Sequence, residues 1–486
     1  MEPLQWLDLY TFQAEGAAEL GDKRRTKRLQ NSMQEITLTP SSSFPEIFHK
    51  KAALEGFYRL VENPAVFSSS ILSPHVEQTL KRCADIGAVL VIHDTTDVSF
   101  DLYDPELRRK NLSRVSTRKQ GFYTHLTMAV ADTPLGIPLG TLNAQSFVHK
   151  KHVKDETEKA FWTQIGGYYD NERQRWFDAI RKTDAELRVA GASGIHVMDR
   201  EADSYSMFSW LHQEDIHYVL RVSNTKRRVY GSPKMLNDVL NDKPFVAEAK
   251  VFLGARGPLR PAKALKRQPP RKARNTTLRF RAVEVTIQRG GSSGEGYTPI
   301  TKADLPQQLT MHLVEAIEVE PPQGESPVRW LLLTSEPIET PEQVIRVIDI
   351  YRKRWIIEEF FKVLKTGCRL ESRQMESAHT LLNVLAILLP VAWRLLMIRS
   401  LDDASPKEHW SAVLEPLAFH VLKKAVPQSK LHNNATVKQV ILAIASLGGH
   451  LKQNGDPGWL VLLRGWRKLS DYVQGAQLAS TFERDT

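Results

Sequence analysis

Residues 340–367 read TPEQVIRVIDIYRKRWIIEEFFKVLKTG, and this segment is the basis for predicting the rest of the fold. Thr340 supplies an N-cap hydroxyl, Pro341 suits the first helical position, and Gln343 completes a capping box. Gly367 is a typical helix stop. Apolar side chains cover most of the circumference between these ends. The segment therefore predicts one helix over residues 340–367 that is buried on much of its surface.

A polar stripe runs along this predicted helix. At about 100° per residue, its side chains fall within an arc of roughly 80°. They are Tyr351, Arg354, Glu358, Lys362 and Lys365. A lone acid between a phenol, an arginine and two lysines is unusual for a solvated face, where acids and bases usually alternate. The stripe suits a metal ion beside a phosphodiester backbone. The alternative is that Glu358 only pairs with Arg354 and Lys362 at i, i+4 spacing.

Two buried strands are each predicted to end at an aspartate. Residues 88–92, AVLVI, form a continuous apolar run that is followed by Asp94, and residues 194–198 form a second run that is followed by Asp199. Open α/β sheets bind their ligands at the carboxyl ends of strands. Each aspartate taken singly could instead form a strand-end turn or cap a helix.

Asp94, Asp199 and Glu358 are predicted to converge. Three carboxylates a few ångströms apart must bind cations or take up protons. Mg²⁺ suits this donor set, because it needs one or two carboxylates per ion together with waters and substrate phosphates. Two such ions about 3.5–4 Å apart can activate a nucleophile and stabilise the leaving oxygen of an in-line displacement.

Length and composition restrict the classes of protein. The 486 residues suggest two or three domains. A net charge of +10 and a pI near 9.3 favour an anionic partner. Cys83 and Cys368 are too few for a disulfide framework or a four-cysteine zinc site, which favours a reducing compartment. Residues 1–10 do not resemble a signal peptide. The apolar residues 381–398 are interrupted by polar residues and a proline, so we expect a core helix pair and no membrane partner.

The first seventy-odd residues predict short helices, followed by strands that include residues 122–131 and 136–144 as a meander. The basic run at residues 23–28 is either a DNA-contacting unit or a solvated face. Its candidate DNA contacts are Arg24, Arg25 and Arg28.

Between Asp199 and the long helix, short alternating stretches predict strands at residues 246–252, 278–288 and 310–317. Residues 250–281 hold eleven Lys or Arg and no Asp or Glu, which favours contact with a polyanion. The alternative is a solvated basic connection, because this stretch also contains four prolines.

After Gly367 the pattern is helical again, over residues 378–401 and 410–466, with a glycine break at 448–449. This region has no carboxylate constellation of its own. Contact with a partner or with DNA is therefore the expected role.

Several of these stretches together resemble a known family. Residues 93–96 (HDTT), 199–203 (DREAD), 330–335 (WLLLTS) and 351–365 are similar to the motifs of bacterial cut-and-paste transposases of the insertion-sequence-four group, the kind carried by transposon Tn-five. The resemblance also takes in residues 20–29 and 448–466, so it spans nearly the whole chain. The spacing Tyr-x-x-Arg-x-x-x-Glu-x-x-x-x-x-x-Lys after a tryptophan-bearing strand is its most specific part.

The resemblance implies a fold of the α/β class with a ribonuclease-H-like catalytic core. The implied catalytic domain covers residues 76–404 and carries a β-rich insertion at about 222–328. It is flanked by a helical N-terminal DNA-binding domain at residues 1–75 and a helical C-terminal dimerisation domain at residues 405–486.

The resemblance also implies roles for single residues. Asp94, Asp199 and Glu358 would be the catalytic triad that binds two Mg²⁺ ions, for which Mn²⁺ would substitute. The residues that would hold phosphates beside the cleavage site are Tyr351, Arg354 and Lys365, with Lys362 as an additional contact. Trp330 would stack on a base extruded from the duplex, unless it is simply a core tryptophan. Arg221 matches a basic position that contacts DNA, and a strand-end salt bridge is the alternative.

The predicted function is that of a DNA transposase acting on double-stranded DNA in the bacterial cytoplasm, associated with the nucleoid. Two transposon ends would be paired by a protein homodimer, cut by metal-activated water, passed through a hairpin intermediate and joined to target DNA by their 3′-hydroxyls. The alternatives are a ribonuclease-H-like nuclease without strand transfer and a DNA-binding regulator without catalytic activity.

Overall fold

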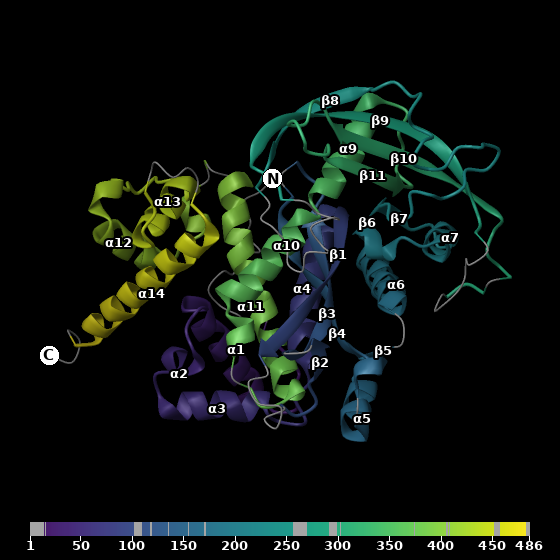
Figure 1. The fold of residues 1–486 in the computed structure, drawn as a ribbon. Helices are drawn as coiled ribbons and strands as arrows, with labels where there is room; N and C mark the ends of the chain where they lie inside the picture. The colour runs from purple at the N-terminus through teal and green to yellow at the C-terminus, as the bar shows by residue number, and fades with distance from the viewer. Residues whose placement is uncertain are drawn as a thin grey trace.

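The computed structural model describes residues 14, 16–101, 109–116, 119–134, 136–153, 155–169, 172–255, 270–290, 299–301, 303–373, 375–404, 407, 409–451 and 457–482. At its centre is one eleven-stranded sheet (Figure 1). Its strands, in spatial order, are β5 (Tyr168–Tyr169), β4 (Pro138–His149), β3 (Lys119–Ala131), β1 (Ala88–Asp101), β6 (Ser193–Met198), β7 (His217–Arg221), β11 (Arg329–Thr334), β10 (Gln308–Glu318), β9 (Arg274–Gln288) and β8 (Ala247–Leu253), with β2 (Ser113–Ser116) paired to β3. The structure is therefore of the mixed α/β class.

The predicted meander is confirmed, because β1, β3 and β4 pair antiparallel in that order. The central strands β6 and β7 instead run parallel to β1 and to each other. Side chains are buried at most positions of β1 and β7 and at the last three positions of β6. A strand buried on both faces reads as a continuous apolar run, which is why residues 88–92 and 194–198 were recognisable from sequence.

One strand boundary was predicted wrongly. The run at residues 88–92 does not end at Asp94, because β1 continues to Asp101 as the antiparallel partner of β3. The parallel pairing of β1 with β6 does stop early, at Ile92 and Val197. Asp94 therefore lies inside a long strand but just beyond the end of the parallel ladder.

The strands predicted at residues 246–252, 278–288 and 310–317 are confirmed as β8, β9 and β10. They extend the central sheet through β11 and do not form a separate sheet. Buried charges cross this extension, since the fully buried Glu315 accepts hydrogen bonds from Arg281 and Arg329. Much of the basic stretch at residues 250–281 lies outside the described residues, so its role stays a prediction.

The predicted helix at residues 340–367 is broken into three parts. It consists of α9 (Pro341–Arg352), α10 (Trp355–Lys362) and a π-helical turn (Val363–Gly367). The capping box at Thr340 and Gln343 and the stop at Gly367 are confirmed. Between α9 and α10, Arg354 N–H bonds to Tyr351 O at 3.1 Å, which is the i−3 spacing of a tighter turn. The tight and wide turns rotate later side chains relative to a regular helix, so the predicted polar stripe does not hold over its whole length.

The helices before the sheet are α1 (Lys23–Leu38), α2 (Phe44–Ile47), α3 (Lys51–Val61) and α4 (Ser68–Ile86). This confirms the predicted run of short helices. Three further helices lie between strands in chain order. They are α5 (Glu156–Gln164), α6 (Glu172–Ala190) and α7 (Tyr205–Gln213). Helix α4 packs against β4 and against α11 (Ala378–Ala404).

Helix α11 is one helix of 27 residues, so the prediction of a helix pair at residues 381–398 was wrong. Pro390 lies inside it without ending it. The surrounding side chains, from Val384 to Trp393, are almost completely buried, and this packing offsets the backbone hydrogen bond that proline cannot make. Among the described helices α11 alone has the length and apolarity to cross a membrane, over Ala378–Met397, and 94% of this stretch is buried within the protein, as in a core helix.

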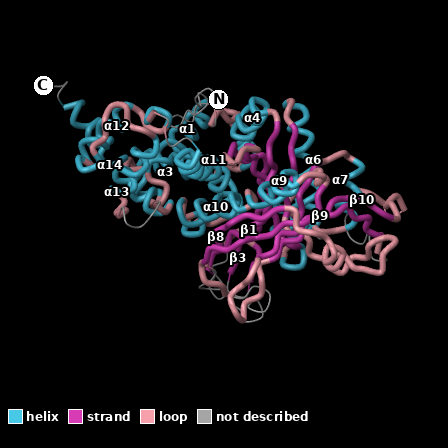
Figure 2. Tube along the Cα trace, turned by 90° about the horizontal axis from the view of Figure 1, so that it is seen from above, coloured by secondary structure: helices cyan, strands magenta, loops and turns pink. Residues whose placement is uncertain are grey.

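The last helices, α12 (Pro416–Ala425), α13 (Val437–Leu447) and α14 (Trp459–Phe482), form a unit with its own apolar core at the end of the molecule away from β8–β10 (Figures 1 and 2). Helices α13 and α14 approach closely at two glycines. A Cβ atom on Gly465 would lie 1.8 Å from Ile444 O, and one on Gly448 would lie 1.9 Å from Val461 O. The helices can therefore cross at this distance only if both positions lack a side chain.

We predict that Gly465→Ala destabilises the unit formed by α12–α14. The added methyl group meets backbone atoms, so the helices must separate, at a cost of about 1–3 kcal/mol. Gly475→Ala on the same helix is the matched control, since a Cβ there has no atom within 4 Å. It should stabilise the helix by up to about 1 kcal/mol. Amide hydrogen exchange in α13 and α14 measures both effects, and equal protection in the two variants would contradict the prediction.

Candidate active site

Asp94 and Asp199 lie side by side at the end of the parallel ladder. The last pair in register is Ile92 and Val197, and each aspartate follows two residues later, Asp94 within β1 and Asp199 directly after β6. Asp94 Oδ1 accepts a hydrogen bond from the N–H of Thr95 at 2.8 Å. Asp199 caps the short 3-10 turn that follows β6, because its Oδ1 accepts from Glu201 N–H at 2.8 Å. Asp199 therefore does cap a helical turn, as the alternative predicted. It also lies beside Asp94, so the two roles do not exclude each other.

Arg354 joins the third carboxylate to the first. Its Nη1 lies 2.8 Å from Asp94 Oδ2, and its Nη2 donates to Glu358 Oε1. The Arg354 side chain is 15% exposed. Burial acts to lower the pKa of Arg354, but the nearby Asp94, Tyr351, Glu358 and Asp199 together raise it above its usual value. The i, i+4 pair of Arg354 with Glu358 thus exists, and it belongs to a larger charge cluster.

The surroundings of Asp94 disfavour the charged form of its carboxyl group. Burial raises its pKa to about 6, and the charges of Asp199 and Glu358 act in the same direction, although Arg354 opposes them. Three carboxylates share one nearby guanidinium, so their formal negative charge is only partly neutralised. Such an excess of negative charge on hard oxygen donors fits divalent cations.

Within the described residues, no group of three His, Cys, Asp or Glu side chains is already arranged around a single cation position. The reason lies in Arg354, whose guanidinium takes up the space and the charge between Asp94 and Glu358. Asp94, Asp199 and Glu358 are the residues whose oxygen atoms could hold metal ions here. Arg354 would have to give up part of its contact with them.

Other predicted residues border this cluster. Tyr351 is buried, and its ring packs edge-on against Trp330 with the centroids 5.7 Å apart. Trp330 is only partly buried, and it packs against the main apolar core. Part of the Trp330 side chain therefore packs as a core tryptophan would, and the rest is accessible. Base stacking by Trp330 and phosphate contact by Tyr351 stay predictions.

Arg221 lies at the end of β7, and its buried Nε atom has no hydrogen-bond partner among the described residues. The structure gives it no strand-end salt bridge within that part of the chain. Arg200 is close by, since burial and the charge of Arg221 lower its pKa, while Tyr351 and Asp199 act to raise it. Arg200 was not among the predicted site residues, although its place in the DREAD motif next to Asp199 was a usable signal.

The two lysines of the predicted stripe face other partners. Lys365 Nζ lies 3.2 Å from Asp97 Oδ1 and 3.7 Å from Glu371 Oε1. Lys362 Nζ lies 3.9 Å from Glu359 Oε1 and is half-exposed. Burial acts to raise the pKa of Asp97, but Lys365 brings it below its usual value. No sequence signal had marked Asp97, because its partner is 268 residues away.

The N-terminal basic run borders a groove of about 360 Å³ between α1 and the start of α3. Its basic lining residues are Lys23, Arg24, Lys27 and Arg28. Burial raises the pKa of Glu35, which lines the same groove. Arg28 lies across Gly56, where a Cβ would be 1.8 Å from its Nη1. The surface that is predicted to contact DNA is therefore a groove lined by basic side chains.

The three predicted arginines differ in their surroundings. Arg24 is the most exposed and pairs with Asp22 at 2.9 Å. Arg25 instead donates to Leu20 O at 3.0 Å, which ties α1 to the preceding segment. Arg28 faces the groove. Arg24 and Arg28 are therefore better placed to meet a ligand than Arg25.

Comparison with known families gives two matches. A model described as transposase DDE domain matches residues 174–390, and a model described as transposase DNA-binding matches residues 11–66. The first range contains Asp199, Glu358 and Arg354, and the second contains the basic groove. Asp94 precedes the first range, and its assignment to the site depends on its position beside Asp199 and Arg354.

We predict that Asp94→Asn stabilises the metal-free protein at neutral pH. The folded-state pKa of about 6 lies above the usual 3.8, so the stability that protonated Asp94 contributes is complete below about pH 4 and is lost as the pH rises through 6. The variant should exceed the wild type by up to about 3 kcal/mol above pH 7 and match it near pH 4. Thermal unfolding in EDTA between pH 4 and 8 measures the difference.

Asp97→Asn is the control for this experiment, because the pKa of Asp97 is lowered and not raised. Its stability contribution is present above pH 4 and is lost on acidification. The variant should therefore be less stable than the wild type at pH 7. A gain in both variants, or in neither, would contradict the electrostatic account of the cluster.

Proposed function

Because this chain is a DDE transposase with a transposase DNA-binding domain, we propose that it binds the terminal repeats of a mobile element, cuts them and joins the freed 3′-hydroxyl ends to target DNA. The DDE domain also implies a ribonuclease-H-like core for the central sheet. The observation that carries the proposal is the cluster of Asp94, Asp199 and Glu358 around Arg354, bordered by Arg200 and Arg221. Acidic side chains that could hold cations thus lie beside basic side chains that could hold phosphates.

DDE transposases use divalent metal ions, and we propose Mg²⁺, with Mn²⁺ as a substitute, held by Asp94, Asp199 and Glu358. Two bound ions would supply a water or 3′-hydroxyl nucleophile at neutral pH and stabilise the leaving oxygen. Every cleavage and joining step is an in-line displacement at phosphorus. The same three carboxylates can therefore serve all of these steps.

Arg354 has two functions in this proposal. Before substrate binding it neutralises part of the carboxylate charge, which limits the repulsion between buried acids. When the carboxylates turn to cations, its guanidinium is released for the scissile phosphate, to which arginine can donate two parallel hydrogen bonds. Tyr351, Lys362 and Lys365 would add contacts to neighbouring phosphates. Arg200 and Arg221 would fix the DNA strand at the opposite border of the site, because the buried Nε of Arg221 lacks a partner among the described residues.

The finer course of the reaction follows the family resemblance. We propose that the chain belongs to the insertion-sequence-four group, that a hairpin forms at each cut end, and that two chains pair the ends through residues 405–486. Trp330, which lies on β11 against Tyr351, would stack on the base that leaves the duplex. The bacterial cytoplasm, at the nucleoid, is the proposed location.

The test is incubation of the protein with Mg²⁺ and a DNA fragment that carries the ends of its own element. Integrated products support the transposase. Cleavage without joining would favour a nuclease, and retarded but uncut DNA would favour a regulator.

We predict that Asp94→Ala binds end DNA with unchanged affinity but lowers the cleavage rate by at least about a thousandfold, because one ligand of the cations is lost. Glu359→Gln is the matched control, since Glu359 adjoins Glu358 but pairs with Lys362. It should cleave at nearly the wild-type rate. Cleavage by Asp94→Ala at the wild-type rate would remove Asp94 from the mechanism.

We predict that Trp330→Ala leaves the first nick intact and slows hairpin formation by about tenfold or more, because stacking on a base contributes about 1–3 kcal/mol. Trp330→Phe should retain most of the hairpin rate, since a smaller aromatic face remains. Denaturing gels of end-labelled DNA resolve the nicked and hairpin products. Equal loss of both steps in Trp330→Ala would instead indicate a packing role against Tyr351.

A further inference from the structure

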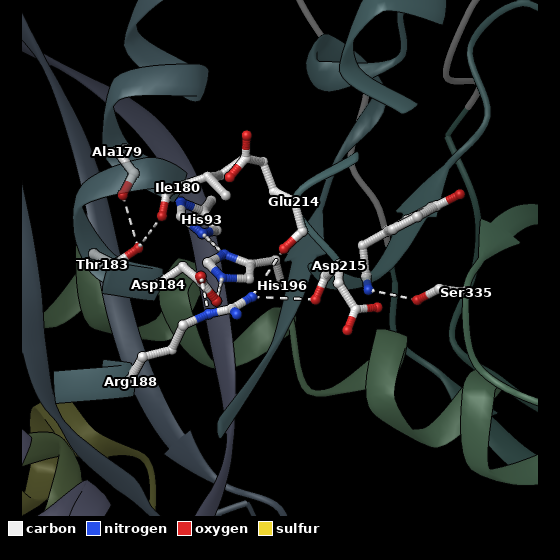
Figure 3. A network of polar contacts seen from close by, with 11 residues as sticks. His93, Ala179, Ile180, Thr183, Asp184, Arg188, His196, Glu214, Asp215 and Ser335 are labelled. Atoms are coloured by element: carbon white, nitrogen blue, oxygen red, sulfur yellow. Dashed lines mark hydrogen bonds and ion pairs between the residues drawn. The ribbon is translucent and has the colours of Figure 1, made fainter. Parts of the chain in front are cut away.

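A row of polar side chains that includes His93, His196 and Asp184 takes no part in the proposed chemistry (Figure 3). His93 Nε2 lies 2.8 Å from His196 Nδ1, which joins β1 to β6. His93 Nδ1 lies 3.2 Å from Thr127 Oγ1 on β3, and His196 Nε2 lies 3.7 Å from Asp184 Oδ1 on α6. Both imidazoles are completely buried.

The partners give these contacts one direction. The Asp184 carboxylate, 3.7 Å from His196 Nε2, favours the proton on that nitrogen by its charge, so that His196 Nδ1 accepts from His93 Nε2–H. His93 Nδ1 then accepts from the hydroxyl of Thr127. Burial lowers the pKa of both histidines, so both are neutral near pH 7. The row therefore ties three strands together without placing a positive charge under the carboxylate cluster.

The row is anchored at its outer end. Arg188 Nε donates to Asp184 Oδ2 at 2.7 Å, and its Nη2 donates to the carbonyls of Glu214 and Asp215 at 3.0 and 3.2 Å (Figure 3). These carbonyls lie in the turn before β7. Asp184 is thus fixed on α6 in the orientation that receives His196.

The row acts where the backbone pairing ends. The last parallel pair is Ile92 and Val197, so the hydrogen bond between His93 and His196 lies at the margin of the ladder that carries Asp94 and Asp199. His93 and Asp94 are consecutive on a strand, and their side chains point to opposite faces. Thr95, on the other side of Asp94, is also held, since its Oγ1 lies 2.9 Å from His125 Nδ1. Both neighbours of Asp94 are therefore fixed from the face opposite to its carboxylate.

We propose that His196 is a positioning residue that holds β1 and β6 through His93, so that Asp94 and Asp199 are presented to the same divalent ion. This inference deepens the proposed function and rests on it. The histidine contributes geometry, and it contacts neither substrate nor cation.

The test is the affinity for Mn²⁺, measured from the electron paramagnetic resonance signal of the free ion, with and without end DNA. His196→Leu removes the acceptor for His93 Nε2–H and should weaken Mn²⁺ binding by about tenfold, as supporting hydrogen bonds around metal ligands do. His196→Asn keeps an oxygen acceptor close to the Nδ1 position and should restore affinity to within about threefold of the wild type. The affinity for end DNA should stay unchanged in both.

His75→Leu is the matched control for loss of a buried imidazole. His75 is also completely buried, and its Nε2 accepts from Thr141 N–H at 3.0 Å, on α4 and β4. Its replacement should lower thermal stability as His196→Leu does, but leave Mn²⁺ affinity unchanged. Thr127→Val, which removes the hydroxyl that donates to His93 Nδ1, covers the case in which His196→Leu does not fold, and should weaken Mn²⁺ binding in the same direction.

The outcomes separate the two proposals. A wild type that binds no Mn²⁺ under either condition, or that binds it equally well after Asp94→Asn, contradicts the proposed metal site. A wild type that binds Mn²⁺ through Asp94, with His196→Leu or Thr127→Val indistinguishable from it, contradicts only the positioning role of the histidine row. A loss in His75→Leu equal to that in His196→Leu would also contradict it, since the effect would then be one of general stability.

Discussion

The Arg354 guanidinium, held between Asp94 and Glu358, is the interaction on which the arrangement of the site depends. It brings together a central strand and a helix that are separated by more than 250 residues. Three mostly buried carboxylates would repel one another and lose hydration if no cation lay among them. The arginine relieves this cost only in part, as the raised pKa of Asp94 indicates. The residual negative charge on these oxygen donors is of the kind that favours cations.

Other basic side chains that are predicted to contact DNA also pair with carboxylates of the protein. Lys365 is held by Asp97 and Glu371, and Arg24 by Asp22. A DNA phosphate that binds one of these lysine or arginine side chains must replace its carboxylate partner. The free energy of binding gained is therefore smaller than for a basic side chain without a partner, and it depends on salt. Arg221 differs, because its buried Nε lacks a partner among the described residues. The strongest pull on a phosphate is therefore expected at the border formed by Arg200 and Arg221.

The continuous sheet explains how distant segments reach one site. The strands β8, β9 and β10 extend the central sheet, and β11 pairs directly with β7. Trp330 and Arg221 thus lie on neighbouring strands, and Tyr351 covers Trp330 from α9. Because strands in one sheet share a hydrogen-bonded frame, a shift in β8–β10 would be transmitted through β11 to Trp330 and Arg221.

The sequence by itself determined the elements and the types of residue at the site. Continuous apolar runs marked the central strands, the capping box marked the start of α9, and the three acids were identifiable because they follow apolar runs or lie on the polar stripe of a helix. Local pattern could not reveal that β1 continues past Asp94, that a tight turn separates α9 from α10, or that α11 passes through Pro390. Each of these depends on partners far away in the chain, which supply hydrogen bonds or burial that local propensity does not encode. For the same reason only the tertiary structure decided which charges meet: Arg354 with Asp94, Lys365 with Asp97, and His93 with His196. Spacing along a chain fixes neighbours within one element, whereas contacts between elements are set by how their buried faces pack.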